Sequence, residues 1–293
     1  MASDLLAIAR SGTRAARAAL DVTAQNIANA SSEGYVRRSV SLSEVSATGT
    51  SNSAGSLTLS GVQVSGISRN ADLFRQSEVR RTGSDAARAN AEVQGLENIE
   101  AAVEQSGIFQ ASIAFEGALQ RLVSDPSDPS LRTSALESAR SLASTFNVTA
   151  GSLDAAGTGL RFEAQDGVNQ VNLLASELAR VNARLTRAAD FSSDQSTLLD
   201  QRDTLLQKIS GQLDVTTIFA ADKTVEVRVG GSNGPQLVAG QSAATLSMAT
   251  AANGTVSFAL NGTAVSHPRA RSPAKARPWC SLPRRAGAST RSR

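Results

Sequence analysis

Apolar and small side chains recur at alternating three- and four-residue intervals near the beginning of the chain. This spacing predicts a helix over residues 4–29, because it places the recurring positions on one helix face. The stripe consists of Leu5, Ile8, Gly12, Ala15, Ala19, Val22 and Asn26. Its small central members allow a second helix to approach closely, whereas the same period also fits a helix packed onto its own domain. The pattern alone leaves both interpretations open.

The predicted helix leads into a polar turn, and the only tyrosine of the chain comes directly after this turn. Asn26, Ile27 and Asn29 precede the turn, and Gly34 and Tyr35 follow it. Gly34 suits the turn because glycine adopts a positive φ at low cost. Asn26 and Asn29 share one helix face, so both amides need partners if that face is buried. We interpret them as packing and register residues that await a partner outside the chain, not as a catalytic pair; the simpler alternative is an amphipathic helix that ends here.

The stretch after the turn predicts little regular structure at first. Residues 40–56 are rich in Ser, Thr and Gly, which favours an irregular connection. Residues 57–67 then alternate between apolar and polar side chains, which is typical of an extended segment. The alternation changes phase at Gly61, and such a shift indicates a bulge or a turn.

A long helical region follows over residues 72–124, with an expected interruption at Gly107. The segment Asp-Pro-Ser-Asp-Pro ends this region, since proline disfavours helix in the residue before it. Ser130 is the expected N-cap of the next helix. The apolar face of that helix comprises Leu131, Ala135, Ala139, Leu142, Phe146 and Leu153.

The most regular heptad pattern lies in the middle of the chain. Its apolar positions follow a strict 3,4 spacing through Val171, Leu174, Leu178, Val181, Leu185 and Ala188. Glu177 and Arg184 flank the stripe, as expected for the solvated sides of a coiled pair. A further helix begins near Asp194 and carries Leu198 and Leu205 on its apolar face. These residues predict two antiparallel helices joined by a short loop.

From residue 215 onward the hydrophobic period changes to two, and Asn-Gly pairs separate the alternating runs, which predicts β-hairpins. The expected fold class is therefore mainly α with a β-rich C-terminal part, in an elongated multi-domain protein with long helical bundle or coiled-coil segments plus a β domain. The expected divisions are an N-terminal helix with its extended connection, a helical bundle, the start of a β-rich domain and a basic disordered tail. These four parts cover residues 1–70, 71–212, 213–267 and 268–293.

The positive net charge of the chain comes from its last residues. Eight of the 29 basic residues lie within residues 268–293, which contain no acidic residue. The other 21 basic residues are outnumbered by 26 acidic ones, so the preceding part carries a net charge of −5. A nucleic-acid-binding protein therefore remains an alternative only through phosphate contacts made by the tail. We expect no nucleic-acid partner for the rest of the chain.

The side chains needed for enzyme chemistry are scarce. The only histidine is His267 and the only cysteine is Cys280, so no thiolate metal site or disulfide framework is expected before the tail. Four carboxylates could in principle hold a hard metal ion, but ion-paired or solvated helix faces explain them better; they are Asp190, Asp194, Asp200 and Asp203. We expect no enzymatic activity, no cofactor and no bound metal. The apolar runs are too short to span a membrane, so we expect no membrane insertion.

Several stretches of the sequence resemble one protein family. The phrase Asn26-Ile27-Ala28-Asn29, followed by a polar turn and Gly34-Tyr35, is similar to the N-terminal signature of bacterial flagellar axial proteins, which comprise rod, hook and hook-associated proteins. The segments 125–147, 198–210 and 214–240 resemble the hook-associated members in particular. The resemblance covers most of residues 1–265.

This resemblance implies a structural protein of the bacterial flagellum that joins hook to filament by stacking of subunits; another rod or hook protein is the alternative within the family. It implies self-association into an axial oligomer, contacts with the hook protein and the next hook–filament junction protein, and an export chaperone. It also implies an extracellular location, reached by the flagellar type III route without a cleaved signal peptide. The implied assembly residues are Asn26, Ile27, Asn29, Gly34 and Tyr35. The packing residues predicted from the helical spacing are Leu5, Ile8, Val22, Val171, Leu174, Leu178, Val181, Leu185, Leu198 and Leu205.

The sequence departs from the family after His267. The family ends in a second terminal helix that packs beside the first, whereas residues 268–293 show no apolar period and contain four prolines. We therefore expect a truncated or frameshifted reading of the gene, with the tail disordered.

Overall fold

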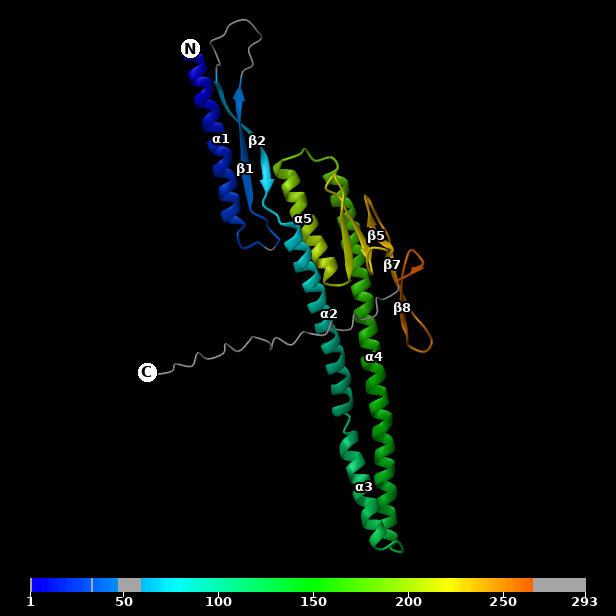
Figure 1. Cartoon of the computed structure of the whole chain (residues 1–293). Helices are drawn as coiled ribbons and strands as arrows, with labels where there is room; N and C mark the ends of the chain where they lie inside the picture. Colours follow the sequence, from blue (N-terminus) through cyan, green and yellow to red (C-terminus); the bar gives the residue numbers. More distant parts are fainter. Residues whose placement is uncertain (1, 33, 47–58, 266–293) are drawn as a thin grey trace, which may run out of the picture.

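The computed structural model describes residues 2–32, 34–46 and 59–265 of the chain. It shows an elongated molecule, with a helix and a hairpin at one end, a long helical shaft at the other, and β-sheets against the side of the longest helix (Figure 1). The fold is mainly α with a β-rich C-terminal part, as predicted. The expected disordered tail lies outside the described residues.

The first helix packs onto a two-stranded antiparallel hairpin. Helix α1 spans Ala2–Ala28, and the hairpin consists of β1 (Arg38–Ser46) and β2 (Leu59–Arg69). Two side chains of the predicted stripe, Ala15 and Val22, are buried, because this face of α1 lies along the hairpin. The stripe thus follows the second interpretation, a helix packed onto its own chain.

The hairpin corrects one prediction and confirms another. Residues 40–46 form part of β1 and not an irregular connection, since backbone pairing with β2 stabilises a strand whose side chains are largely polar; residues 47–56 lie outside the described part. The predicted irregularity near Gly61 is present as a register shift between the pairs Glu44–Val62 and Ser46–Leu59. Gly61 has a φ of 96°, which glycine tolerates best.

Three helices build the shaft, which we define as α2, α3 and the part of α4 that packs against them. Helix α2 spans Leu73–Glu104, α3 spans Ile108–Ser124 and α4 spans Pro129–Leu185. The predicted interruption at Gly107 is confirmed, and its φ is 75°. The N-cap of α4 is Asp128 and not Ser130, because the Asp128 carboxylate accepts from the backbone N–H of Ser130 and proline occupies the first helical position.

Helix α5 and the β-strands cover the other end of α4. Helix α5 spans Ser193–Ser210 and packs against α4 after a short loop, as predicted. A four-stranded antiparallel sheet follows the order β3-β4-β5-β6, and a three-stranded sheet follows the order β7-β8-β9. The strands are β3 (Val215–Phe219), β4 (Val225–Val229), β5 (Gln236–Ala239), β6 (Ser242–Ala243), β7 (Leu246–Thr250), β8 (Val256–Leu260) and β9 (Thr263–Ala264).

The main hydrophobic core lies where α4, α5 and the sheets meet. It includes Leu178 and Leu206 from the two helices and Val227 from β4, all fully buried. A buried asparagine of α4 joins the helix to the strands: Asn182 donates to the carbonyl groups of Val225 and Gly240 at 2.9 and 2.8 Å. Helices and sheets therefore share one core at this end of α4. No helix in the described ranges has an apolar stretch of the length needed to cross a membrane.

Candidate functional site

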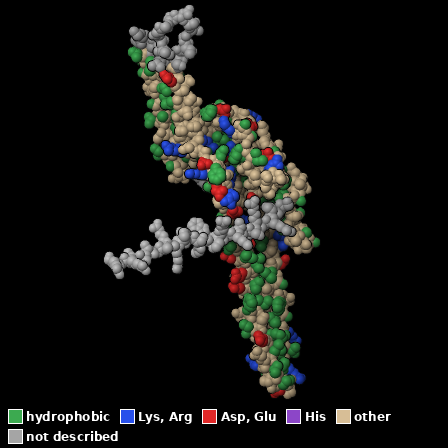
Figure 2. Space-filling view, viewed as in Figure 1, with side chains coloured by type: hydrophobic (Ala, Val, Ile, Leu, Met, Phe, Trp, Pro, Cys, Tyr) green, Lys and Arg blue, Asp and Glu red, His purple; other side chains and the backbone are tan. Residues whose placement is uncertain are grey.

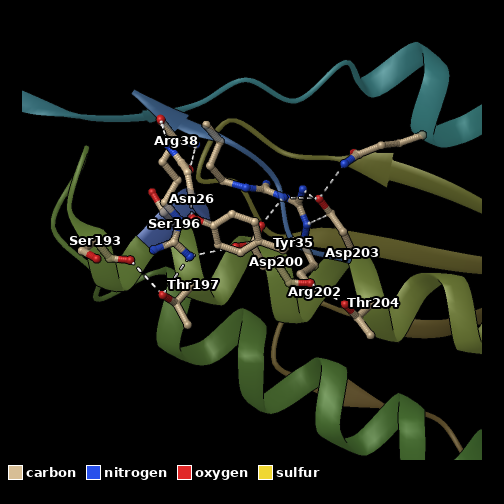
Figure 3. Close-up of polar contacts among 12 residues, drawn as sticks. Asn26, Tyr35, Arg38, Ser193, Ser196, Thr197, Asp200, Arg202, Asp203 and Thr204 are labelled. Atoms are coloured by element: carbon tan, nitrogen blue, oxygen red, sulfur yellow. Dashed lines mark hydrogen bonds and ion pairs between the residues drawn. The ribbon is translucent and has the colours of Figure 1, made fainter. Parts of the chain in front are cut away.

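Asn26, near the end of α1, holds the chain as it leaves the polar turn. Its amide Nδ2 donates to the backbone carbonyl of Arg38 at 2.8 Å, and its Oδ1 accepts from the backbone N–H of the same residue at 2.9 Å. The Tyr35 hydroxyl donates to the same Oδ1 at 2.9 Å (Figure 3). The side chain of Asn26 therefore pairs with both backbone groups of Arg38, the first residue of β1, as a neighbouring strand would. We call Asn26, Gly34, Tyr35 and Arg38 the anchor.

Arg38 extends the anchor to α5. Its guanidinium lies 5.3 Å from the centre of the Tyr35 ring, within the range of a cation–π contact. Its Nη2 lies 2.8 Å from Oδ2 of Asp200 and 3.2 Å from Oγ1 of Thr197 (Figure 3). These contacts join the entry of β1 to a helix about 160 residues further along the chain, so the anchor fixes α1 and the hairpin to the helical part.

Gly34 allows the turn to approach α5 closely. Its φ is 77°, in the left-handed region. A Cβ atom at this position would lie 2.3 Å from Oγ1 of Thr204, far inside van der Waals contact. Glycine is thus required here by both the backbone conformation and the space available.

A second arginine from the hairpin reaches the same helix. Arg69 lies opposite Arg38 in the strand register, and its Nη2 lies 2.8 Å from oxygens of both Asp200 and Asp203. Arg202 binds the remaining side of Asp203, with its Nη2 2.8 Å and its Nε 3.0 Å from Oδ1. The two arginines at the open end of the hairpin thus share the Asp200 carboxylate, and Arg69 also reaches Asp203 three residues further along α5.

Burial and ion pairing oppose each other at Asp203. Burial by itself raises the pKa of this carboxyl, but the Arg202 and Arg69 guanidinium groups outweigh it and hold the pKa below its ordinary value. Asp203 is therefore ionised at neutral pH. Burial lowers the pKa of Arg202, and Asp203 opposes this effect.

A groove borders the anchor on its outer side. It has a volume of about 880 Å³ and lies between the end of α1, the turn, and the helices α4 and α5. Exposed charged side chains of α4 and α5 line it, including Glu177, Arg180, Arg184 and Lys208.

Three of the four aspartates considered as a metal site are engaged in ion pairs. Asp200 and Asp203 are ion-paired with arginines, and Asp190 is ion-paired with Lys223. Within residues 2–32, 34–46 and 59–265, no group of three or more His, Cys, Asp or Glu side chains is arranged to hold a metal ion.

The structure separates the predicted assembly residues into two groups. Asn26, Gly34 and Tyr35 meet in the anchor, whereas the Ile27 side chain is 73% exposed. Asn29 donates only to the carbonyl of Gln25, one helical turn earlier. The expectation that both asparagines await an outside partner is therefore wrong for Asn26, because β1 of the same chain supplies its partners.

The predicted packing residues also divide. Leu5 is 69% exposed because it lies to the side of the face that meets the hairpin, and Ile8 is half-buried. The other predicted packing residues are buried, with Val22 against the hairpin and the rest in the main core: Val171, Leu174, Leu178, Val181, Leu185, Leu198 and Leu205.

Sequence reasoning missed the arginine and aspartate partners in this site. Asp200 and Asp203 were expected on ion-paired or solvated helix faces, but neither Arg38 nor Arg69 was identified as their partner. One signal was present in the sequence. Arg202 lies between Asp200 and Asp203 on a helix whose other face is apolar, and the hairpin strands begin and end with the basic residues Arg38 and Arg69. Opposite charges placed in this way favour ion pairs at the edge of a core.

Comparisons with known protein families find a match in the region that contains most of the anchor. Residues 6–35, which contain most of α1 and the turn, match the family model of the flagella basal body rod protein. Residues 93–274 match the model described as the flagellar hook-associated protein FlgK helical domain. This match covers more than half of the chain, which belongs to the FlgK helical-domain family. The resemblance to hook-associated members is thus confirmed.

Curated relatives share this family. The chain is 28% identical over 222 residues to flagellar hook-associated protein 1 of Bacillus subtilis (strain 168), covering 73% of this chain and 44% of the relative. It is also 28% identical to the proteins of the same name from Salmonella typhimurium, covering 83% of this chain and 44% of that protein, and from Escherichia coli K12, covering 89% and 48%. The chain spans less than half the length of these relatives.

A solved structure supports the fold. The structure of the flagellar hook junction protein FlgK from Burkholderia pseudomallei superposes with a TM-score of 0.51 at 22% identity. The match covers 68% of this chain and 35% of that protein. At this level of identity the likeness concerns the fold alone.

Proposed function

We propose that this chain is a structural subunit of the bacterial flagellum and helps to join the hook to the filament by subunit stacking, without catalytic turnover. Its family membership supports a structural role in the flagellum. The anchor supports a specific mechanism, in which α1 is the axial element and the hairpin transmits its position to the helical body. We further propose the division into residues 1–70, 71–212, 213–267 and 268–293 as its domain organisation.

The observation that carries this proposal is the unpartnered outer face of α1. Leu6, Leu20 and Ile27 are 72%, 68% and 73% exposed, on the side away from the hairpin. Their positions differ by multiples of seven, so they share one position of a heptad repeat. An exposed heptad seam is typical of a helix that packs against another helix, and the inner face of α1 is already occupied by the hairpin.

The partners proposed for this seam follow from the family. They are further copies of the chain in an axial oligomer, the hook protein, and the next hook–filament junction protein. An export chaperone and the flagellar type III route to the cell exterior complete the proposal. We propose no nucleic-acid partner; DNA binding that survives deletion of residues 268–293 in a salt-dependent binding assay would contradict this part.

A single substitution on the outer face tests the proposal. Leu20→Glu places a charge in the seam and is expected to reduce association with purified hook protein and with other copies of the chain at least tenfold. Arg14→Glu is the matched control, because Arg14 is exposed on another face of α1. Sedimentation velocity measures association, and circular dichroism checks that both variants are folded. Equal association of wild type, Leu20→Glu and Arg14→Glu would exclude the seam as the interface.

A further inference from the structure

Four arginines gather where the hairpin, α2 and α5 meet. We call Arg38, Arg69, Arg80 and Arg202 the arginine cluster; each is buried, with exposed fractions of 4–7%. Among the described residues, the carboxylates that pair with them are those of Asp200 and Asp203. The cluster thus buries four positive charges against two negative ones. An uncompensated buried charge is strongly unfavourable, so such an excess calls for a further anion.

Arg80 is the member of the cluster that forms no ion pair with a carboxylate, although the charge of Asp203 acts on it. Within the described part of the chain it makes no hydrogen bond or ion pair, and its Nη2 is buried without a partner. Its guanidinium lies 5.8 Å from the centre of the Phe219 ring, which also lies 4.7 Å from that of Arg202. Both oxygens of Asp203 are already engaged, by Arg202 on one side and by Arg69 and Gln76 on the other.

A small cavity borders Arg80. It has a volume of about 180 Å³, several times the roughly 30 Å³ that one water molecule occupies in the liquid. Arg80 and Gln76 of α2 line one side, Asp203 and Gln207 of α5 line another, and the turn residues 34–36 line a third. Gln76 donates through its Nε2 to Asp203, and its Oε1 is buried without a partner. The cavity therefore offers one free cationic donor and one free acceptor.

We propose that this cavity binds a small protonated oxyanion of the phosphate class, held between the turn residues 34–36 and α2. Arg80 supplies the charge-assisted donor for one oxygen, and Gln76 Oε1 accepts from the protonated oxygen of hydrogen phosphate. A carboxylate or sulfate at neutral pH lacks this proton and satisfies Arg80 alone. Burial lowers the pKa of Arg80, and the charge of nearby Asp203 opposes this effect without reversing it. A bound anion at this place strengthens the junction between the turn and the helical body.

The test uses the full 293-residue chain and inorganic phosphate, at constant ionic strength set with sodium chloride. Isothermal titration calorimetry should give saturable binding with one site per chain, and acetate and sulfate should bind at least threefold more weakly than phosphate. Arg80→Met should weaken phosphate binding at least tenfold. Arg75→Met is the matched control on the same helix, since the Arg75 side chain is 85% exposed, and its binding should equal that of the wild type.

A second variant separates binding from folding. Gln76→Met should lower phosphate affinity toward that of sulfate while sulfate binding stays unchanged, a shift in preference that general destabilisation cannot produce. Circular dichroism identifies any variant that fails to fold, and Arg80→Lys, which keeps the charge but loses the planar fork, then replaces Arg80→Met with an expected intermediate affinity. Absence of saturable phosphate binding in the wild type would overturn the proposal. So would equal affinity in the folded Arg80 variants and the wild type.

Discussion

The two ends of α4 carry similar apolar patterns but have opposite surroundings. Toward its C-terminus the pattern is buried, with Leu178 0% and Leu185 2% exposed. Toward its N-terminus and middle, Leu136, Phe146 and Phe162 are 59%, 54% and 69% exposed. The same unbroken helix therefore presents its apolar side chains to a core at one end and to solvent at the other.

The difference comes from the number of elements that surround each end. The C-terminal part of α4 lies between α5 and the sheets, so side chains over most of its circumference are covered. Among the described residues of the shaft, α4 packs against α2 and α3, and a pair of helices buries a single seam between them. Figure 2 shows the result as hydrophobic side chains spread along the surface of the shaft. Burial is thus decided by the neighbours and not by the helix.

The largest expected effect on the free energy of unfolding comes from truncating one apolar side chain at each end of α4 and comparing the two losses. Leu178→Ala should lower the free energy of unfolding by about 2–5 kcal/mol, because it leaves a cavity in the fully buried core. Phe162→Ala should change it by less than about 0.5 kcal/mol, since surface substitutions cost little. Urea denaturation followed by circular dichroism measures both. Similar losses for the two variants would show that solvent does not reach Phe162 and would remove the distinction between the ends.

A somewhat smaller effect is expected from the asparagine that joins α4 to the strands. Asn182→Ala leaves the carbonyl groups of Val225 and Gly240 and the N–H of Val225 without their partner in a site that is 0% exposed. We expect a loss of about 2–4 kcal/mol in the free energy of unfolding. Asn169→Ala, at an exposed position of the same helix, is the control and should be nearly neutral. A loss below 1 kcal/mol for Asn182→Ala would mean that water replaces the amide.

The sequence predicts the helices of this comparison but not their burial. The 3,4 spacing from Val171 to Leu185 follows from helix geometry alone, so it is visible in one segment. Whether Phe146 is covered depends on how many other elements pack there, and no local pattern carries that information. The strand β1 was missed for a related reason: Val40 and Leu42 alternate with serines, and Leu42 is 51% exposed, so the strand depends on backbone pairing and on Asn26 more than on burial.

The anchor could be predicted in part. Asn26, Gly34 and Tyr35 lie within ten residues of one another, so a local sequence motif is enough to identify them. Their connection to α5 is not visible, because Arg38 and Asp200 are separated by 162 positions and an ion pair leaves no periodic signal. A single sequence therefore indicates which residues are unusual but not which partner satisfies them.

The smallest expected effect is the response of the Asp203 carboxylate of α5 to acid. The pKa of Asp203 is lowered from an ordinary value of 3.8, so the folded state binds fewer protons there than the unfolded state. The stabilisation that Asp203 provides is therefore complete above about pH 4 and is lost as the pH falls through the lower, folded-state value. The difference in free energy of unfolding between wild type and Asp203→Asn should stay constant from pH 7 to pH 5 and shrink below pH 4.

The shaft offers the control for this pH dependence. Asp154→Asn makes the same substitution at an exposed position of α4, and its free energy of unfolding should follow that of the wild type at every pH. Guanidinium chloride screens charges, so urea titrations at each pH are the suitable measurement. A difference between wild type and Asp203→Asn that grows toward acid pH would reverse the assigned direction of the pKa.

The pairing of Arg38 with Arg69 at the open end of the hairpin has a consequence for the order in which the chain folds. Two like charges directly opposite each other destabilise a rung of a strand pair. This rung becomes favourable only when the carboxylates of Asp200 and Asp203 are present between the arginines, and both belong to a helix formed much later in the sequence. We therefore expect the last rung of the hairpin to become stable only after α5 is present, about 130 residues further along the chain.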